Sequence, residues 1–567
     1  MTFEQAAVLA LLAAMLVLFA LDRLRMELVA LGGLAIGVAL GLVPAGAAFA
    51  GLADPAFVTV VEILLVVTVL ARSPLLDRLA RAIAARKPSL TGAAALLCAL
   101  SAALSVFMNN IGALALMLPV IFGVCRACGF DPRAMLMPAS FAALLGGMSS
   151  VIGTPANLIV SRQLEAATGA GFGFFDIGAA GIPAALAGLA VVVLLVPRLI
   201  PRAAAAPDPE DADRRLVAQM AVPPGSPVAG QPFGALPAAV ISAWRGGQRL
   251  FLPRTDLRIE PGDLLLVDAG TAALRRLVAA GALDWAAQAA SVQAVVMPES
   301  PAIGSRLATV AAFGPGVTVV AVSPQARRIE GSLGDIQLSI GDIVHLAGDR
   351  AAIDRALRQA DLLPLDGSRE AASEPATGGT FALAAFVAGI LLSAVAGLAP
   401  HLAFGLVVLA LVAGGTLNLR TALPQLNWPI LLMLAAMIPL GTAVATTGAA
   451  QVLAEALLAS MPQGSAAALT GAMLVLAIAV TPFVNNASTA LVLGPIAVAV
   501  AGAAGIDPRP LLLAVAIGAS IDFLTPFGHH NNTLVMGLAG YRFSDFLKAG
   551  WPVTLAAAAA AFAVLAA

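Results

Sequence analysis

Charged side chains are scarce in this sequence. Asp, Glu, Lys and Arg together make up 11% of its 567 residues, whereas 60% of the residues are hydrophobic. Soluble globular proteins carry about 25% charged residues, so this chain cannot cover a water-facing surface in the usual way. The composition excludes an ordinary soluble protein and indicates a protein that lies in a lipid bilayer.

Net charge and cysteine content point to no other class. The 31 basic and 32 acidic residues nearly balance, so no bulk charge attracts a nucleic acid. Three cysteines cannot build a disulfide framework, and the pair Cys125 and Cys128 has no second C-x-x-C that would complete a zinc site. We interpret these two as reduced residues beside a membrane helix. The sequence also lacks H-E-x-x-H and G-x-S-x-G, which argues against an enzyme.

One stretch of the sequence occurs twice. Residues 105–157 contain SVFMNNIGALALMLPV and GGMSSVIGTPAN, and their polar and breaker residues return later in the same order. At an offset of 376, Asn109, Asn110, Pro119, Asp131, Pro132 and Arg133 reappear as Asn485, Asn486, Pro495, Asp507, Pro508 and Arg509. At an offset of 375, Gly153 and Asn157 return as Gly528 and Asn532. Two copies of one unit are predicted, with the working site where the copies meet.

Each copy contains five apolar runs near the ~20 residues that cross a bilayer. They fall at about 3–21, 26–43, 56–72, 134–161 and 177–197, and again at 380–398, 402–418, 428–446, 511–538 and 550–566. The first run begins with Glu4, without a basic n-region or cleavage site, and is predicted to be a retained span.

A further apolar segment lies between the third and fourth run of each copy, at about 90–125 and 466–501, and an Asn-Asn pair interrupts it. Its arms of about 14–18 residues predict a re-entrant hairpin with the asparagines at the tip.

Loop charge predicts the orientation. Five crossings in each copy, with one connecting region, place the second copy upside down relative to the first. If residues 198–379 are cytoplasmic, fourteen Lys and Arg residues of the membrane halves lie inside, and only Arg162 and Arg509 lie outside. The predicted fold is an all-α polytopic membrane protein built from inverted repeats, 1–202 and 377–567, each of five transmembrane helices plus one re-entrant hairpin.

The connecting region has a different character. Acidic, Pro- and Ala-rich linkers flank short strand-like alternations, and a pattern recurs within it. Ser226-Pro227 leading to Gly262-Asp263 matches Ser300-Pro301 leading to Gly341-Asp342. We predict two cytoplasmic α+β modules, 203–285 and 286–376. Neither contains G-x-G-x-x-G or a P-loop, so nucleotide binding has no sequence support.

Polar oxygens gather at the interrupted helices. SSVIGTPAN and TPFGHHNN each place Gly and Pro within an apolar run, next to hydroxyl and amide groups. Uncharged oxygen ligands suit a monovalent cation such as Na⁺, and broken helices expose helix ends that bind ions. The predicted sodium ligands are Asn109, Asn110, Ser149, Gly153, Asn157, Asn485, Asn486, Asp522, Thr525, Gly528 and Asn532. The predicted substrate contacts are Asn110, Thr154, Pro155, Asn486, Ala487, Ser488, Thr489, Thr525 and Pro526. The alternative is that these small polar residues only pack helices.

Four other features carry weaker predictions. Asp522, an intramembrane carboxylate, is assigned a supporting role in cation binding. His529 and His530 have either a proton-coupling or substrate role, or a lining or interface role. Glu62 is interpreted as a polar contact of the scaffold. The basic run 72–87 is predicted to be an amphipathic helix on the cytoplasmic surface.

The motifs NNIGALALMLPV with IGTPANLI, and NNASTALVLGPI with SIDFLTPFGHHNNTLVMG, resemble the divalent-anion:sodium symporter family of the ion-transporter superfamily. More narrowly, the chain resembles the branch with two TrkA-C (RCK-C) domains between the repeats. The resemblance implies a homodimer, an elevator mechanism and Na⁺ symport of sulfate or dicarboxylates. Family members often carry Ser-Asn-Thr at the hairpin tips, where this chain has Asn109-Asn110-Ile111 and Asn485-Asn486-Ala487. The missing threonine hydroxyls disfavour a dicarboxylate, so sulfate is the preferred substrate.

The predicted function is therefore Na⁺-coupled symport of a divalent anion in the inner (plasma) membrane, with Na⁺ as coupling ion and no organic cofactor. A small molecule or nucleotide that regulates the TrkA-C modules is a further expected partner. The alternatives are a Na⁺/dicarboxylate symporter, a proton-coupled carrier or antiporter that uses Asp522 and His529, and a membrane sensor that acts through the TrkA-C modules.

Overall fold

The computed structural model divides the chain into two compact units. One consists of Met1–Pro201, Pro375–Asn532 and Arg542–Ala567, and the other of Arg202–Glu374 and Thr533–Tyr541. The structure describes residues 1–21, 26–71, 81–83, 85–200, 215–250, 257–285, 291–298, 300–314, 316–324, 331–365, 379–426, 428–460, 465–484, 486–526 and 528–567. Asn485, most of the basic run 72–87 and both linkers of the connecting region lie outside these residues.

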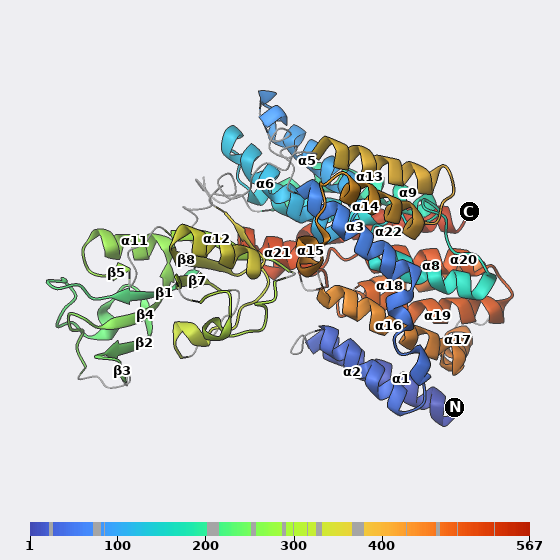
Figure 1. Ribbon diagram of the computed structural model, residues 1–567, viewed down its shortest axis with the longest axis horizontal. Helices are drawn as coiled ribbons and strands as arrows, with labels where there is room; N and C mark the ends of the chain where they lie inside the picture. The colour runs from blue at the N-terminus through green and yellow to red at the C-terminus, as the bar shows by residue number, and fades with distance from the viewer. Residues whose placement is uncertain are drawn as a thin grey trace. The chain divides into compact units, whose positions relative to one another are not determined.

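Helices dominate both sequence halves (Figure 1). The first half contains α1 (Phe3–Leu21), α2 (Met26–Ala39), α3 (Pro55–Ala71), α5 (Leu90–Ser105), α6 (Asn110–Cys128), α7 (Arg133–Gly147), α8 (Pro155–Thr168), α9 (Gly178–Leu194) and α10 (Val196–Leu199), with the 3-10 turns η1 (Ala45–Ala47) and η2 (Ala50–Ala53) before α3. The second contains α13 (Gly379–Ala394), α14 (Pro400–Ala413), α15 (Leu419–Ala422), η7 (Leu423–Gln425), α16 (Trp428–Thr446), α17 (Ala449–Ser460), α18 (Ala466–Val480), α19 (Asn486–Ala504), α20 (Pro508–Ser520), α21 (His530–Ala539) and α22 (Phe543–Leu565).

Matched positions in the two halves carry the same helix caps. Ser89 caps α5 by accepting from Gly92 N, and Ser465, 376 residues later, caps α18 by accepting from Ala468 N. Asp131 Oδ1 accepts from Arg133 N at 2.9 Å, and Asp507 Oδ1 accepts from Arg509 N at 2.9 Å, again 376 residues apart. The sequence duplication therefore corresponds to duplicated local contacts.

The helices differ in length from the predicted runs. Among the described residues, five helices are long and apolar enough to cross a membrane, or six if the bent pair in residues 431–459 is one span. The other apolar helices have 10–17 residues. The second arms of the predicted hairpins, α6 and α19, have 19 residues each and belong to the long class. They are longer than predicted because each begins directly at the Asn pair and continues past an internal proline, Pro119 or Pro495.

Helices from the two halves pack against one another. In Figure 1 the blue and cyan helices of the first half interleave with the orange and red helices of the second. Helix α9 packs along α22, α2 along α16, α3 along α14, and α8 against α19 and α20. Three fully buried rings join α7, α20 and α22, with Phe141 5.1 Å from Phe523 and 6.3 Å from Phe546 between centroids. The interior of the helical unit is thus shared between the halves.

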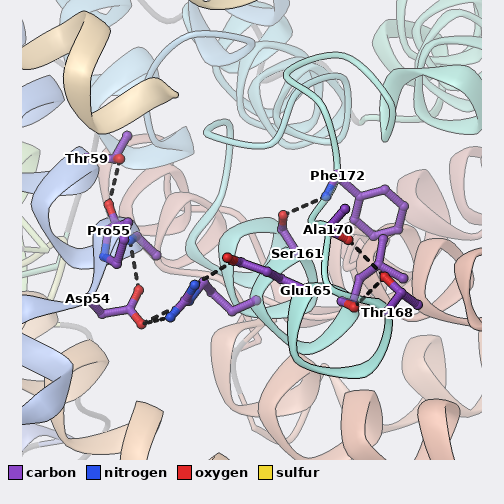
Figure 2. Close-up of polar contacts among 11 residues, drawn as sticks. Asp54, Pro55, Thr59, Ser161, Glu165, Thr168, Ala170 and Phe172 are labelled. Atoms are coloured by element: carbon purple, nitrogen blue, oxygen red, sulfur yellow. Dashed lines mark hydrogen bonds and ion pairs between the residues drawn. The ribbon is translucent and has the colours of Figure 1, made fainter. Parts of the chain in front are cut away.

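An ion pair connects the start of α3 with α8 (Figure 2). The buried Asp54 accepts from Ala56 N through Oδ1, and its Oδ2 lies 2.9 Å from both Nε and Nη2 of Arg162. Nη1 of Arg162 lies 2.5 Å from Glu165 Oε2, one turn along α8. At the end of α8, Ser161 Oγ accepts from Phe172 N at 3.0 Å. These contacts fix how α8 ends and which end of α3 it contacts.

The second unit contains one nine-stranded antiparallel sheet. Its elements are β1 (Arg215–Ala221), η3 (Phe233–Ala235), β2 (Ala239–Arg245), β3 (Gln248–Leu250), β4 (Leu264–Gly270), α11 (Thr271–Ala279), β5 (Asp284–Trp285), β6 (Ser291–Val296), η4 (Leu307–Thr309), β7 (Val317–Ser323), η5 (Leu333–Asp335), β8 (Ile343–Gly348), α12 (Arg350–Gln359) and β9 (Leu362–Pro364). The order is β3-β2-β4-β1-β7-β8-β6-β9, with β5 also paired to β1.

The predicted sequence pattern of the connecting region recurs in this sheet as equivalent contacts. The strand order β2-β4-β1-β5 is followed by β7-β8-β6-β9, so each group has the same arrangement. Ser226 Oγ donates to Ala282 O, and Ser300 Oγ donates to Ala360 O. The two groups are joined where β1 pairs with β7, and each has its own hydrophobic cluster.

Candidate functional site

One pocket in the helical unit brings together the two Asn pairs and both broken helices. Its empty volume is about 800 Å³, including the part open to the outside. Polar groups come from four separate segments, and apolar side chains of α3, α6 and α16 complete the wall. The lining residues are Val60, Ile63, Leu64, Asn109, Asn110, Ile111, Ile152, Pro155, Met433, Asn486, Ala487, Gly528, His529 and His530.

Four helices begin at this pocket. The first residues of α6, α8, α19 and α21 are Asn110, Pro155, Asn486 and His530, and all four line it. A helix N-terminus carries unpaired N–H groups and the positive end of the helix dipole. Neither Lys nor Arg is among the lining residues that the structure describes. The pocket therefore offers an anion backbone and amide N–H groups rather than a basic side chain.

The first tip is held by several hydrogen bonds. Asn109 caps α6 by accepting from Gly112 N at 2.7 Å. Asn110, only 3% exposed, accepts from Ser105 Oγ at 2.8 Å, and its Nδ2 lies 3.2 Å from His529 Nε2. Asn531 Nδ2 donates to the backbone oxygen of Asn110 at 2.9 Å. The start of α21 thus contacts both the side chain and the backbone of the first tip.

The second tip is more open. Asn486 is partly exposed in the pocket, and its Oδ1 accepts from Ala487 N at 2.8 Å. Behind it, Thr481 Oγ1 donates to Thr489 Oγ1 at 3.3 Å, and Ser488 and Thr489 are buried. The hydroxyl groups of this tip therefore point into the protein, and the amide of Asn486 faces the pocket.

The first broken helix is closed by Asn157. Helix α7 ends at Gly147 and α8 begins at Pro155, so this proline starts a helix, where it costs no hydrogen bond, rather than interrupting one. Asn157 Nδ2 donates to Gly147 O at 3.0 Å and to Ser150 O at 2.7 Å. Its Oδ1 is buried and has no hydrogen-bond partner among the described residues.

The second broken helix is closed in the same way by Asn532. Its Nδ2 donates to Asp522 O at 2.9 Å and to Thr525 O at 3.2 Å. These three residues lie 375 positions after Gly147, Ser150 and Asn157. The offset of 376 would place Gly146 opposite Asp522, but the hydrogen bonds make Gly147 its counterpart, because the residue lost between the copies lies before the break.

The side chain of Asp522 has no equivalent in the first half. It is 1% exposed, and neither carboxylate oxygen has a hydrogen-bond partner in the part of the chain that the structure describes. A Cβ on Gly528 would lie 2.1 Å from Asp522 Oδ2, so the loop passes directly over the carboxylate. A buried carboxylate without a partner is costly, and a bound cation would offset that cost.

The structure separates the predicted site residues into two groups. Those that line the pocket are Asn109, Asn110, Pro155, Asn486, Ala487 and Gly528. Those that lie behind its wall are Ser149, Gly153, Thr154, Asn157, Ser488, Thr489, Asp522, Thr525, Pro526 and Asn532. Many of the second group bond to backbone. Thr154 Oγ1 accepts from Asn157 N, for example, and Thr525 Oγ1 accepts from Gly528 N.

Sequence reasoning missed three residues of the site: Ser105, Ser140 and Asn531. Ser140 Oγ donates to Asn532 Oδ1 at 2.8 Å across 392 residues, and Asn531 reaches Asn110 across 421 residues. The prediction relied on positions that match between the halves, and none of these three has a like counterpart. Only the His-His-Asn-Asn run around Asn531, unusually polar for an apolar segment, could have indicated it.

Comparison with known proteins agrees with this arrangement. A family model described as "Citrate transporter" matches residues 16–518 and 458–567. An uncharacterized transporter of Escherichia coli, YfbS, is 27% identical over 97% of this chain and 96% of its own length, and one from Synechocystis is 27% identical over 95% and 93%. Sodium/sulfate cotransporter 2 of Chlamydomonas reinhardtii is 28% identical over 43% of this chain and 32% of its own length.

The predicted resemblance is thereby confirmed at the level of a membrane transporter with relatives named sodium/sulfate cotransporters. On the family match, which covers most of its length, the chain belongs to the citrate transporter family.

Proposed function

We propose that the protein is a secondary transporter that carries a divalent oxyanion, sulfate in the first place, together with Na⁺. The observation that carries this proposal is the meeting of four helix N-termini in one pocket without a lining Lys or Arg. Each N-terminus is equivalent to roughly +0.5 elementary charge, so four of them present about two positive charges. That matches a divalent anion, and a pocket without fixed positive charge can release the anion again.

The buried oxygens behind the wall support cation coupling. Asn157 Oδ1 in the first half and the Asp522 carboxylate in the second are acceptors without partners among the described residues. Buried acceptors normally find a donor or an ion. Na⁺ bound beside each broken helix would satisfy these oxygens and partly compensate the charge of the anion. The relatives named sodium/sulfate cotransporters favour the same pair of ions.

Uptake into proteoliposomes tests the proposal directly. Radiolabelled sulfate should accumulate only with an inward Na⁺ gradient and not with an equal K⁺ gradient. The Asn110→Ala protein, reconstituted at equal density, provides the inactive reference. Sulfate uptake that is independent of Na⁺ would contradict the coupling. A pH gradient that Na⁺ dissipates without any anion would favour an antiporter instead.

A polycarboxylate is the second candidate substrate. The family description favours it, and so does the apolar part of the wall, where Val60, Ile63, Leu64 and Met433 could contact a carbon skeleton. Against it, Ile111 and Ala487 occupy the tip positions where a hydroxyl could bind a carboxylate. A competition panel of sulfate, thiosulfate, molybdate, succinate and citrate against Na⁺-dependent uptake decides between the two classes.

The remaining parts of the proposal concern architecture. The matched caps and the matched Asn157 and Asn532 bonds support two repeats, which the loop charges orient oppositely in the inner (plasma) membrane. In an elevator mechanism the hairpins and broken helices would move against a scaffold that forms a homodimer. The sheet unit corresponds to the two TrkA-C modules and would lie in the cytoplasm, where it either supports the dimer or responds to a small molecule.

A further inference from the structure

Two neighbouring histidines at the start of α21 both line the pocket but have different contacts. His529 uses both ring nitrogens: Nδ1 accepts from Asn531 N at 3.2 Å, and Nε2 lies 3.2 Å from Asn110 Nδ2. His530 makes no hydrogen bond to any residue that the structure describes. The two imidazoles therefore cannot have the same role.

His529 is committed to the first tip. A neutral imidazole has one N–H, so accepting at Nδ1 places the proton on Nε2. Both contacts are then hydrogen bonds if the Asn110 amide turns its oxygen toward Nε2 and its nitrogen toward Ser105 Oγ, a rotation that keeps the same atoms in contact. Asn531 adds the bond to Asn110 O. His529 and Asn531 together hold Asn110 from both sides.

His530 is the side chain left to bind an anion. It is the first residue of α21 and lines the pocket beside the N-termini of α6, α8 and α19. The third positions of the two tips, Ile111 and Ala487, supply no hydroxyl. The remaining side-chain donors in the described lining are the amides of Asn109 and Asn486, so an imidazole N–H adds a donor that the tips lack.

We propose that the two histidines divide the work of the pocket: His530 hydrogen bonds an oxygen of the transported oxyanion, and His529 is a positioning residue for Asn110. The proposal rests on the proposed function, since it assumes that an anion is carried. It assigns anion affinity to His530 and the integrity of the first tip to His529.

The first test compares variants of His530 in Na⁺-dependent sulfate uptake. His530→Ala should raise the KM for sulfate about 10- to 100-fold, because a hydrogen bond to a charged group is lost. His530→Gln, which keeps an N–H donor, should recover most of the affinity, whereas His530→Phe, which keeps the ring volume, should not. The Na⁺ concentration for half-maximal uptake should remain unchanged in all three.

The second test uses His529 and Asn531. His529→Ala and Asn531→Asp should lower the maximal rate with little change in the sulfate KM of the remaining activity, because the tip loses its support rather than its ligand. His529→Gln, with a donor near Nε2, should recover part of the rate. Thermal unfolding in detergent verifies that each variant is folded.

The outcomes separate the inference from the function on which it rests. Wild-type protein without Na⁺-dependent anion uptake would remove the proposed function. Uptake with an unchanged KM in His530→Ala, or equal rescue by Gln and Phe, would overturn the role of His530. A purely KM effect in His529→Ala would overturn the division between the two.

Discussion

The two broken helices share their backbone contacts and differ in charge. Asn157 and Asn532 each donate to two carbonyl oxygens, 375 residues apart in the sequence. The position before the break is Gly147 in one half and Asp522 in the other. The free oxygen also differs, since Asn157 Oδ1 has no partner among the described residues, whereas Asn532 Oδ1 accepts from Ser140.

This difference separates what duplication preserves from what it allows to change. The amide that closes each break is fixed, because without it two carbonyls at a helix end would be unpaired. The side chain beside the break is not fixed by this geometry, so one half could acquire a carboxylate. If both breaks bind a cation, one does so with neutral oxygens and the other with a charged ligand, and their affinities should be unequal.

The largest expected effect is at the tips. Asn110→Ala removes a side chain that contacts Ser105 and His529, whereas Asn486→Ala removes one bonded only to the adjacent Ala487 N. We expect Na⁺-dependent uptake to fall about 100-fold or more for Asn110→Ala and by less for Asn486→Ala. Initial rates in proteoliposomes measure both, and equal losses would contradict the difference in tip support.

Gly147→Ala should have nearly as large an effect. An added Cβ would lie 2.2 Å from Asn110 Oδ1 and 3.0 Å from Thr154 Cγ2, so the first tip must shift. Uptake should fall at least about tenfold. Gly502→Ala, in helix α19, is the matched control because nothing lies within 4 Å of its added Cβ. Wild-type uptake in Gly147→Ala would mean that the packing of Asn110 against α7 is not required.

Asp522→Asn should act on the cation. The substitution keeps the shape of the side chain and removes its charge, so the Na⁺ concentration for half-maximal uptake should rise about tenfold. Glu62→Gln is the control, because this other intramembrane carboxylate belongs to α3, and it should leave the Na⁺ dependence unchanged. Equal Na⁺ dependence of wild type and Asp522→Asn would place the cation elsewhere.

The smallest expected effect concerns the ion pair of Figure 2, which only the first half has. Position 537, at the offset of 375 from Arg162, is a glycine. Arg162→Gln leaves the buried Asp54 without its partner, whereas Glu165→Gln removes an exposed contact. The unfolding temperature in detergent should fall by a few degrees for Arg162→Gln and by less than about one degree for Glu165→Gln. The reverse order would contradict the importance of Asp54.

Local patterns predicted the elements well. Apolar runs and capping residues such as Ser89 and Ser465 placed α5 and α18, and the Asn pairs placed the starts of α6 and α19 within a residue. The exact breaks were harder. Pro155 was expected to interrupt a helix but begins one, because the chain had already left the helix at Gly147. A run of hydrophobic residues does not show where in it the hydrogen-bond ladder stops.

The sequence by itself determined that this is a membrane protein with two similar halves and polar breaks at fixed positions, because hydropathy, spacing and caps act over a few residues. Only the tertiary structure decided which polar groups share the pocket. His529 and Asn531 lie more than 400 residues from Asn110, and Thr154 and Thr525 turned out to bond their own loops rather than to line it. Such choices depend on how helices of both halves pack, which no local pattern records.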